Sequence, residues 1–193
     1  MLMPDFLTHY YEKSAGPFSN LSRLPLEQAE QILAQIRRDG NRFASQRSGD
    51  YLQKRLALEV RIRALFETKG GKPKLEKPQY MILGSCSWLR EWYVDGQELQ
   101  ISLALFPESC LSFTYGDSFP AMNYNDGKPY RSKVYTFSEI SEVIRRYGLP
   151  QVWNRDGRHG PERYIEAQVW DDAPLMEYLN VPWRTPAKET HGH

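Results

Sequence analysis

The sequence predicts an α+β fold: two helices in the N-terminal third, then a mainly antiparallel, twisted sheet with one further packed helix. Three observations lead to this prediction. Helix boundary residues and apolar stripes mark the segment 25–68. After residue 79, apolar and polar residues alternate with the two-residue period of strands. A capping box at Thr136–Glu139 then opens a well-marked helix that ends near Gly148.

Two helices are expected in the N-terminal third. Pro25 suits the first position of a helix, and Gly40 ends it. Its apolar stripe comprises Leu26, Ala29, Ile32, Leu33 and Ile36. A second helix is expected from about Asp50 to Thr68, with Ser48 or Asp50 as its cap. The apolar stripe of this second helix is ragged.

Five stretches have the pattern of strands. They are 6–11, 80–83, 99–105, 111–115 and 163–169. Asp95-Gly96 is a turn signal before the third of them, and Pro107 bounds it. Trp88 and Trp92 are four residues apart, which fits a helical turn, and Pro174 marks the start of a last short helix.

Length and composition bound the class of protein. A chain of 193 residues with 40% hydrophobic and 25% charged residues is typical of one folded, soluble domain. We expect a single domain over 1–193, with a helical, basic part (1–78), a sheet-rich part (79–180) and a tail (181–193). The two cysteines, Cys86 and Cys110, lack the spacing of a metal site. No targeting peptide or apolar run of about 20 residues is evident, so we expect a cytoplasmic location, no membrane and no metal.

Charge is unevenly distributed along the chain. The net charge is +1, yet the segment from Arg37 to Lys77 holds twelve basic and five acidic residues, a net +7. Such a segment fits either a solvated helix face or a surface that contacts the phosphates of nucleic acid. Both interpretations stay open from the sequence.

The strand around Glu166 is the most informative stretch. Its alternation places Ile165, Ala167 and Val169 on one face, which we predict to be core. The opposite face carries Tyr164, Glu166, Gln168 and Trp170. A carboxylate beside a carboxamide between large aromatic rings is paired, hydrogen-bonded or functional. As a general base or as a stabiliser of an oxocarbenium ion, Glu166 is the candidate catalytic residue. The alternative is a surface glutamate paired with an arginine such as Arg163.

The run Ser112–Ser118 ends another strand with hydroxyls, a glycine and an acid. These residues suit a ligand-contacting loop, in which Tyr115 and Asp117 would line a cleft with the Glu166 strand. They equally suit an ordinary turn, because Asp, Ser and Gly satisfy local backbone groups.

The chain resembles the DarT-type ADP-ribosyltransferases, which modify nucleic acid using NAD. The resemblance lies in Thr8-His9, in Phe113–Asp117, and in the Arg163–Val169 strand. It implies that Glu166 is the catalytic carboxylate, acting on the nicotinamide ribose or on the acceptor. It further implies that His9 holds NAD, and that a basic residue of the segment Arg37–Lys77 approaches the phosphates. The residues expected to bind the cofactor are therefore His9, Tyr115, Asp117, Tyr164, Gln168 and Trp170.

Two classes of function remain open. The first is NAD-dependent ADP-ribosyl transfer to nucleic acid or protein with Glu166. The second is a non-enzymatic domain that binds a protein through aromatic residues, or nucleic acid through its basic segment. The aromatic residues in question are Trp88, Trp92, Tyr93 and Trp153.

Overall fold

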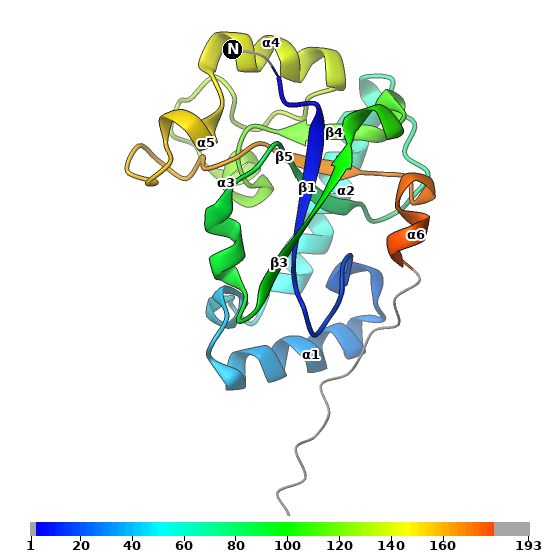
Figure 1. Ribbon diagram of the computed structural model, residues 1–193, viewed down its shortest axis with the longest axis vertical. Helices are drawn as coiled ribbons and strands as arrows, with labels where there is room; N and C mark the ends of the chain where they lie inside the picture. Colours follow the sequence, from blue (N-terminus) through cyan, green and yellow to red (C-terminus); the bar gives the residue numbers. More distant parts are fainter. Residues whose placement is uncertain (1–2, 180–193) are drawn as a thin grey trace, which may run out of the picture.

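The computed structural model describes residues 3–179 and has the predicted α+β architecture, built around one antiparallel sheet (Figure 1). The strand order is β3-β1-β2-β5-β4. The strands are β1 (Phe6–Glu12), β2 (Gln79–Leu83), β3 (Gly96–Ser102), β4 (Leu111–Thr114) and β5 (Glu166–Val169). The helices are α1 (Leu26–Asp39), α2 (Tyr51–Thr68), α3 (Ser118–Asn123), α4 (Phe137–Tyr147), α5 (Pro150–Trp153) and α6 (Met176–Leu179).

The long helices begin and end where the sequence predicts. α1 has Pro25 at its N-cap and Gly40 at its C-cap, where a positive φ of 68° favours glycine. α4 has the capping box, because Thr136 and Glu139 each bond the backbone N–H of the other. Within the predicted stripe of α1, Ala29 and Leu33 are buried, but Leu26 is 49% exposed. The buried stripe of α1 therefore begins later than predicted. Leu26 lies at the start of the helix, outside the part that packs against the rest of the protein.

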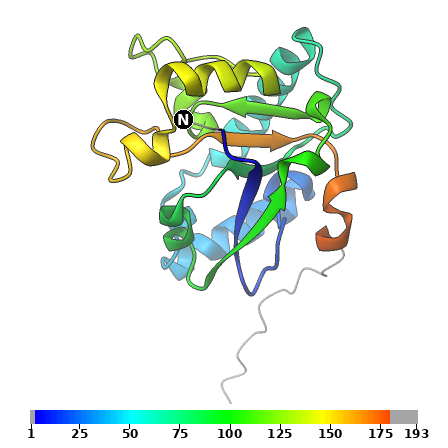
Figure 2. The ribbon, with the colours of Figure 1, turned by 45° about the horizontal axis from the view of Figure 1, so that its top comes forward.

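The two faces of the sheet pack against different helices. On one face, Leu7, Met81, Phe113 and Ala167 join one apolar core with Ile140 and Ile144 of α4. The pairing of Met81 and Phe113 with Ala167 puts these three side chains on the same face. The other face packs against α2, which lies behind the strands in Figure 1. Figure 2, turned by 45°, shows α4 on the opposite side of the sheet from α1 and α2.

The third strand lies earlier in the chain than expected. β3 begins at Gly96 and ends at Ser102, and the chain then turns through a short 3-10 helix, Leu103–Leu105. At the start of this turn the Leu103 N–H donates to Asp5 O at 2.8 Å. The helical N-terminal part also supplies β1, which pairs with β2 and β3 and so ties residues 1–78 into the sheet. The predicted tail, 181–193, lies outside the described residues.

Membrane-spanning helices and metal-binding clusters are both absent from residues 3–179. No helix in this range is long and apolar enough to cross a membrane. Within the same residues, no group of three or more His, Cys, Asp or Glu side chains is arranged to hold a metal ion.

Candidate functional site

Glu166 lies in the interior of the sheet on the face covered by α2. Its neighbours across the two ladders are Thr114 in β4 and Ile82 in β2. The side chains of Ile165, Ala167 and Val169 point into the α4-side core, as the alternation predicts. Glu166 itself is only 7% exposed, so its carboxyl group is neither on a flat surface nor solvated. A buried carboxyl group of this kind requires hydrogen bonds or a function.

A directed chain of hydrogen bonds ends at the Glu166 carboxyl. Trp170 Nε1 donates to Ser112 Oγ at 2.8 Å, and Ser112 Oγ donates to Gln168 Oε1 at 2.8 Å. Gln168 Nε2 then donates to Glu166 Oε1 at 3.1 Å. The indole N–H can only donate, so it fixes the direction of both later bonds in the chain. Gln168 is thereby oriented with its amide hydrogens toward Glu166.

Asp117 and Ser118 approach Glu166 from the loop between β4 and α3. Asp117 Oδ1 accepts the Phe119 N–H at 2.8 Å and so caps α3. Asp117 Oδ2 accepts the Tyr164 hydroxyl at 3.0 Å. The Ser118 side chain hydrogen-bonds the Glu166 carboxyl. The loop of the Ser112–Ser118 run therefore serves as a helix cap and also adjoins Glu166.

The environment favours the neutral form of Glu166. Burial, and after it the negative charge of Asp117, raise the pKa of Glu166 to about 8. Arg55 and the hydrogen bonds from Ser118 and Gln168 oppose this pKa shift. A carboxyl group with a pKa near the working pH is suited to proton transfer.

Arg55 and Glu59 of α2 complete the polar face, and sequence reasoning missed both as site residues. Arg55 Nε bonds Glu59 Oε1 at 3.1 Å, and the Arg55 guanidinium lies 4.1 Å from the ring centroid of Tyr80. The Tyr80 hydroxyl donates to the same Glu59 oxygen at 3.1 Å. The signal was present in the sequence: positions 55 and 59 fall on the same helical stripe as Leu52, Ile62 and Phe66. The raggedness of the α2 stripe therefore marks charged residues that face the sheet.

The predicted site residues separate into two groups. The structure brings Asp117, Tyr164, Gln168 and Trp170 together with Glu166 on the α2 side. It places Tyr115 on the α4 side, where its hydroxyl donates to Gly148 O at 2.9 Å and accepts from Trp153 Nε1 at 3.1 Å. Burial raises the pKa of Tyr115 to about 12. Tyr115 therefore fixes the α4–α5 connection to the sheet, while its neighbour Asp117 approaches Glu166.

His9 also lies away from Glu166, and its ring is committed to backbone groups. Its partner in the β1–β3 ladder is Leu99, and its ring stacks on Phe18 at 4.2 Å. The Phe18 N–H donates to His9 Nε2 at 2.8 Å, so Nδ1 carries the proton and donates to Tyr80 O at 3.0 Å. Burial lowers the pKa of His9 to about 4. This neutral ring holds the 9–18 segment against β2.

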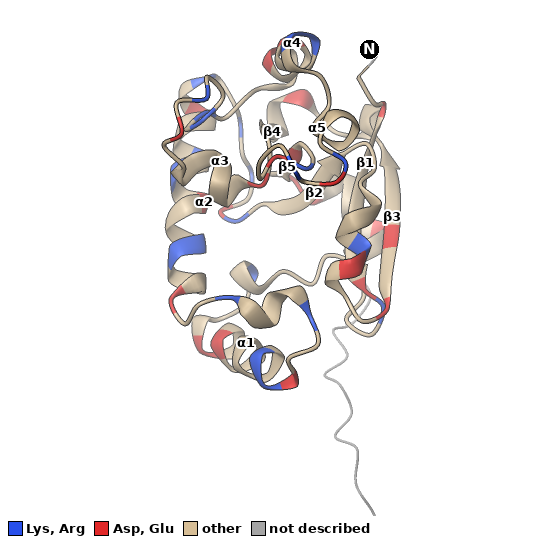
Figure 3. Ribbon diagram, turned by 90° about the vertical axis from the view of Figure 1, so that its left-hand side faces the viewer, with Lys and Arg blue, Asp and Glu red and all other residues tan. Residues whose placement is uncertain are grey.

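Six of the twelve basic residues of the segment Arg37–Lys77 form ion pairs with acidic residues. Lys54, Arg55 and Arg63 pair with Asp50, Glu59 and Glu67 along α2. Further ion pairs of the segment join Arg42 to Glu12, Lys69 to Glu139, and Lys74 to Asp171. Figure 3 shows acidic and basic residues interspersed on α1 as well. Three acidic residues from outside the segment, Glu12, Glu139 and Asp171, therefore reduce its net positive charge without cancelling it.

The aromatic residues considered for a binding surface are mostly packed internally. Trp88, Trp92 and Tyr93 border the cluster around Tyr10 and Tyr164. Trp92 stacks on Phe43 at 4.0 Å, with the two ring planes 15° apart. Phe43 remains 41% exposed and Trp153 36% exposed. Phe43 and Trp153, together with Tyr124, which is 53% exposed, are the most accessible aromatic side chains among residues 3–179.

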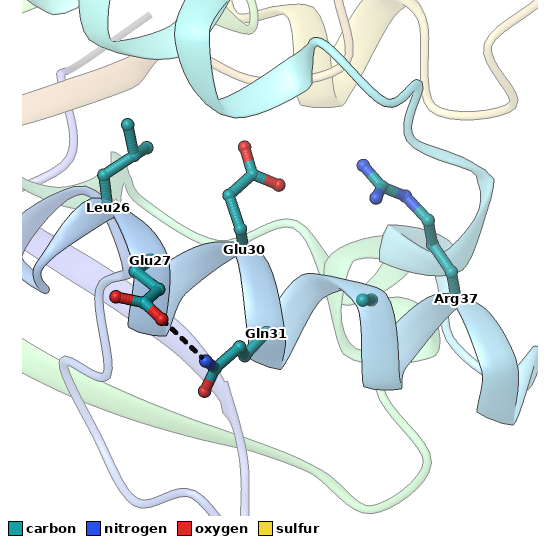
Figure 4. Close-up of a pocket in the computed structure, with 6 residues that line it drawn as sticks. Leu26, Glu27, Glu30, Gln31 and Arg37 are labelled. Carbon is teal, nitrogen blue, oxygen red and sulfur yellow. Dashed lines mark hydrogen bonds between the residues drawn. The ribbon is translucent and has the colours of Figure 1, made fainter.

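Two hollows lie away from Glu166. One, of about 740 Å³, runs along α1 and is shown in Figure 4. It is lined by Leu26, Glu27, Glu30, Gln31, Ala34 and Arg37. The second, of about 580 Å³, lies between α4 and the preceding loop and includes Lys133, Tyr135, Arg146 and Tyr147. Neither hollow includes a residue of the Glu166 group.

Comparisons with known proteins do not assign this site. No family model matches the chain, and searches of curated proteins and of solved structures gave no significant match. A functional interpretation of this protein therefore rests on the geometry of the α2-side polar face.

Proposed function

We propose that this protein is an enzyme that uses Glu166 in NAD-dependent ADP-ribosyl transfer to nucleic acid or protein. The observation that supports the proposal is the buried Glu166 carboxyl, oriented by Gln168 and placed beside Asp117 and Arg55. The likeness of the Arg163–Val169 strand to the DarT-type strand with its catalytic glutamate supplies the choice of NAD.

The reaction exchanges one bond for another at the C1′ atom of the nicotinamide ribose. The C1′–N bond breaks, and its electron pair goes to the nicotinamide nitrogen, which leaves uncharged. A nucleophilic atom of the acceptor forms the new bond to C1′ and loses a proton. The ionised Glu166 would stabilise positive charge on the ribose or accept that proton. Its low exposure strengthens both roles, because charges interact more strongly where water is excluded.

The surroundings of Glu166 suit an anionic, aromatic ligand. Arg55, Tyr80 and Asp117 are more exposed than Glu166, although only 17% of the Arg55 side chain is accessible, so they would form the outer edge of the site. The Arg55 guanidinium belongs to the basic segment and is close enough to Glu166 to influence its pKa. Arg55 is therefore the residue of that segment best placed to meet a phosphate near the reacting centre.

The test is turnover of NAD by purified protein with nucleic acid or with protein as the acceptor. Nicotinamide release and transfer of labelled ADP-ribose are measured for wild type, Glu166→Gln and the control Glu98→Gln on the exposed part of β3. We expect Glu166→Gln to reduce turnover by at least about 100-fold, the contribution of a positioned acid–base group. Glu98→Gln should match wild type. Unchanged NAD binding and turnover in Glu166→Gln would contradict the proposal.

A non-enzymatic binding domain is the second candidate, and the exposure of Phe43 and Trp153 favours it. In that case the exposed rings would contact a protein partner, and Glu166 would have a structural role only. Capture from native lysate with wild type and Phe43→Ser, in the presence and absence of NAD, separates the two. A stoichiometric partner lost in Phe43→Ser and insensitive to NAD supports the binding domain.

A further inference from the structure

The hollow between α4 and the loop before it, here called the α4 hollow, has the size and the lining of a ligand site. Its volume of about 580 Å³ lies within the roughly 300 to 1,000 Å³ that small-molecule sites occupy. It is separate from the Glu166 group, because α4 lies on the opposite side of the sheet from α2 (Figure 2). The side chains that decide its chemistry are Lys133, Tyr135, Glu142, Arg145, Arg146 and Tyr147.

Two of the three basic side chains in the α4 hollow lack an acidic partner. Arg145 forms an ion pair with Glu142 on the same helix, and both side chains are exposed. Lys133 and Arg146 are exposed as well and, within residues 3–179, form no ion pair. The hollow therefore carries two positive charges that no carboxylate of the described residues balances. A phosphate group with two negative charges matches such a pair of cations.

The Arg146 guanidinium is not needed to satisfy the end of α4. Arg146 lies in the last turn, where a positive charge also complements the helix dipole. The carbonyl groups at this end already have donors, since the Gly148 N–H donates to Ile144 O at 2.8 Å and the Tyr115 hydroxyl to Gly148 O at 2.9 Å. The guanidinium of Arg146 lies 5.2 Å from the ring centroid of Tyr147 and forms no hydrogen bond within the described part of the chain. Its N–H donors are thus free to meet a ligand.

Two tyrosine side chains are held in place beside these cations. The backbone of Tyr135 exchanges two hydrogen bonds with Phe113 in β4, at 2.8 and 2.9 Å. The ring of Tyr147 meets those of Tyr115 and Tyr130 edge to face, with centroids 6.0 and 5.5 Å apart. The hydroxyl groups of Tyr135 and Tyr147 form no hydrogen bond within residues 3–179, and neither is fully buried. Fixed rings with free hydroxyl groups suit the base and the sugar of a nucleotide.

We propose that the α4 hollow binds a nucleoside phosphate, with Lys133 and Arg146 on the phosphate and the rings of Tyr135 and Tyr147 against the base. The inference goes beyond the proposed function and does not depend on it, because the hollow shares no residue with the Glu166 group. A free nucleotide and a nucleic acid strand present the same chemistry to the hollow, and the experiments below separate these two sources.

The first experiment measures the binding of AMP, adenosine and a short oligoadenylate by titration calorimetry at low salt. We expect AMP to bind at least about 10-fold more tightly than adenosine, because its phosphate accepts charge-assisted hydrogen bonds. The affinity for AMP should fall as salt is added. If AMP does not saturate the protein at millimolar concentration, or if adenosine binds equally well, the proposal is overturned. Tighter binding of the oligoadenylate than of AMP supports the proposal with nucleic acid as the source of the phosphate.

The second experiment compares variants that each remove one positive charge. Lys133→Gln and Arg146→Gln change exposed side chains, so the fold should be retained. Arg158→Gln is the matched control, because the Arg158 side chain is 82% exposed and pairs with Asp156 outside the hollow. We expect each variant in the hollow to weaken AMP binding by about 10-fold, while the control matches wild type. Wild-type affinity in either variant of the hollow contradicts the proposal.

The place of binding separates this inference from the proposed function. Backbone amide shifts in NMR spectra should change most in residues 129–135 and in α4 when AMP is added, and Glu166→Gln should bind AMP as wild type does. Shifts confined to β5 and α2, with binding lost in Glu166→Gln, would overturn this inference and support a nucleotide at Glu166 instead. If AMP binds in the α4 hollow but NAD is not turned over, the inference holds and the proposed function fails.

Discussion

The two faces of the sheet are both buried but differ in chemistry. On the α4 side, Phe113 and Ala167 have no exposed surface and meet apolar side chains. On the α2 side, Thr114, Gln168 and Glu59 are equally inaccessible, yet they are polar or charged. All three form hydrogen bonds, although Glu59 Oε2 has no partner. Apolar burial stabilises a fold directly, whereas buried polar groups stabilise it only when their bonds are complete. The α4 side therefore maintains the fold, and the α2 side holds the candidate site.

The largest expected effect comes from the apolar face. Phe113→Ala removes a fully buried ring from the α4-side core, and we expect a loss of about 3 to 5 kcal/mol in the free energy of unfolding. Urea denaturation followed by circular dichroism measures it, with an unchanged m-value as the check on two-state unfolding. A loss below about 1 kcal/mol would contradict the conclusion that the apolar core on the α4 side maintains the fold.

Substitution of Glu166 is expected to change the free energy of unfolding by an intermediate amount, and this change depends on pH. Because the pKa of Glu166 is about 8 in the folded protein against an ordinary 4.5, the folded state retains a proton that the unfolded state has lost between these values. Stability therefore falls as pH rises from about 4.5 to 8. Glu166→Gln removes this dependence and should raise the free energy of unfolding at pH 8 by on the order of 3 kcal/mol relative to wild type.

His9 provides the contrast for the same measurement. Its pKa is lowered to about 4 from 6.5, so the unfolded state binds the proton between these values. The contribution of His9 is complete above pH 6.5 and is lost as pH falls through 4. Unfolding curves from pH 4 to 9 should retain this acid loss in Glu166→Gln while the alkaline decline disappears. An alkaline decline that persists in the variant would contradict the assignment to Glu166.

The smallest change in the free energy of unfolding is expected from breaking the hydrogen-bond chain that runs from Trp170 to Glu166. Ser112→Ala removes the group that accepts from Trp170 and donates to Gln168, leaving a buried indole N–H unpaired. We expect a loss of about 1 to 2 kcal/mol in the free energy of unfolding. If Glu166 acts as proposed, NAD turnover should also fall, since Gln168 is no longer oriented. Ser141→Ala on α4 is the matched control, because that hydroxyl bonds only its own helix and Met3.

Local patterns were sufficient for much of the fold. The ends of α1 and α4 are set by Pro25, Gly40 and the Thr136–Glu139 capping box, since caps act within one helical turn. The division of β5 into two faces is a consequence of strand alternation. The sequence did not separate Asp117 from Tyr115, because which strand end meets which helix depends on pairing between distant segments.

By itself, the sequence determined the three long helices, the approximate positions of the five strands, and that Glu166 and Gln168 share a face. It did not indicate the short helices α3 and α5. Only the tertiary structure decided what covers that face. Arg55 and Glu166 are 111 residues apart in the chain. They come close in space because α2 packs across the β2–β5–β4 part of the sheet. The tertiary structure also decided that His9 binds backbone groups and that half of the basic residues of the segment Arg37–Lys77 form ion pairs. Hydrogen bonds and ion pairs between remote residues form only once the sheet order is set, and no local pattern encodes that order.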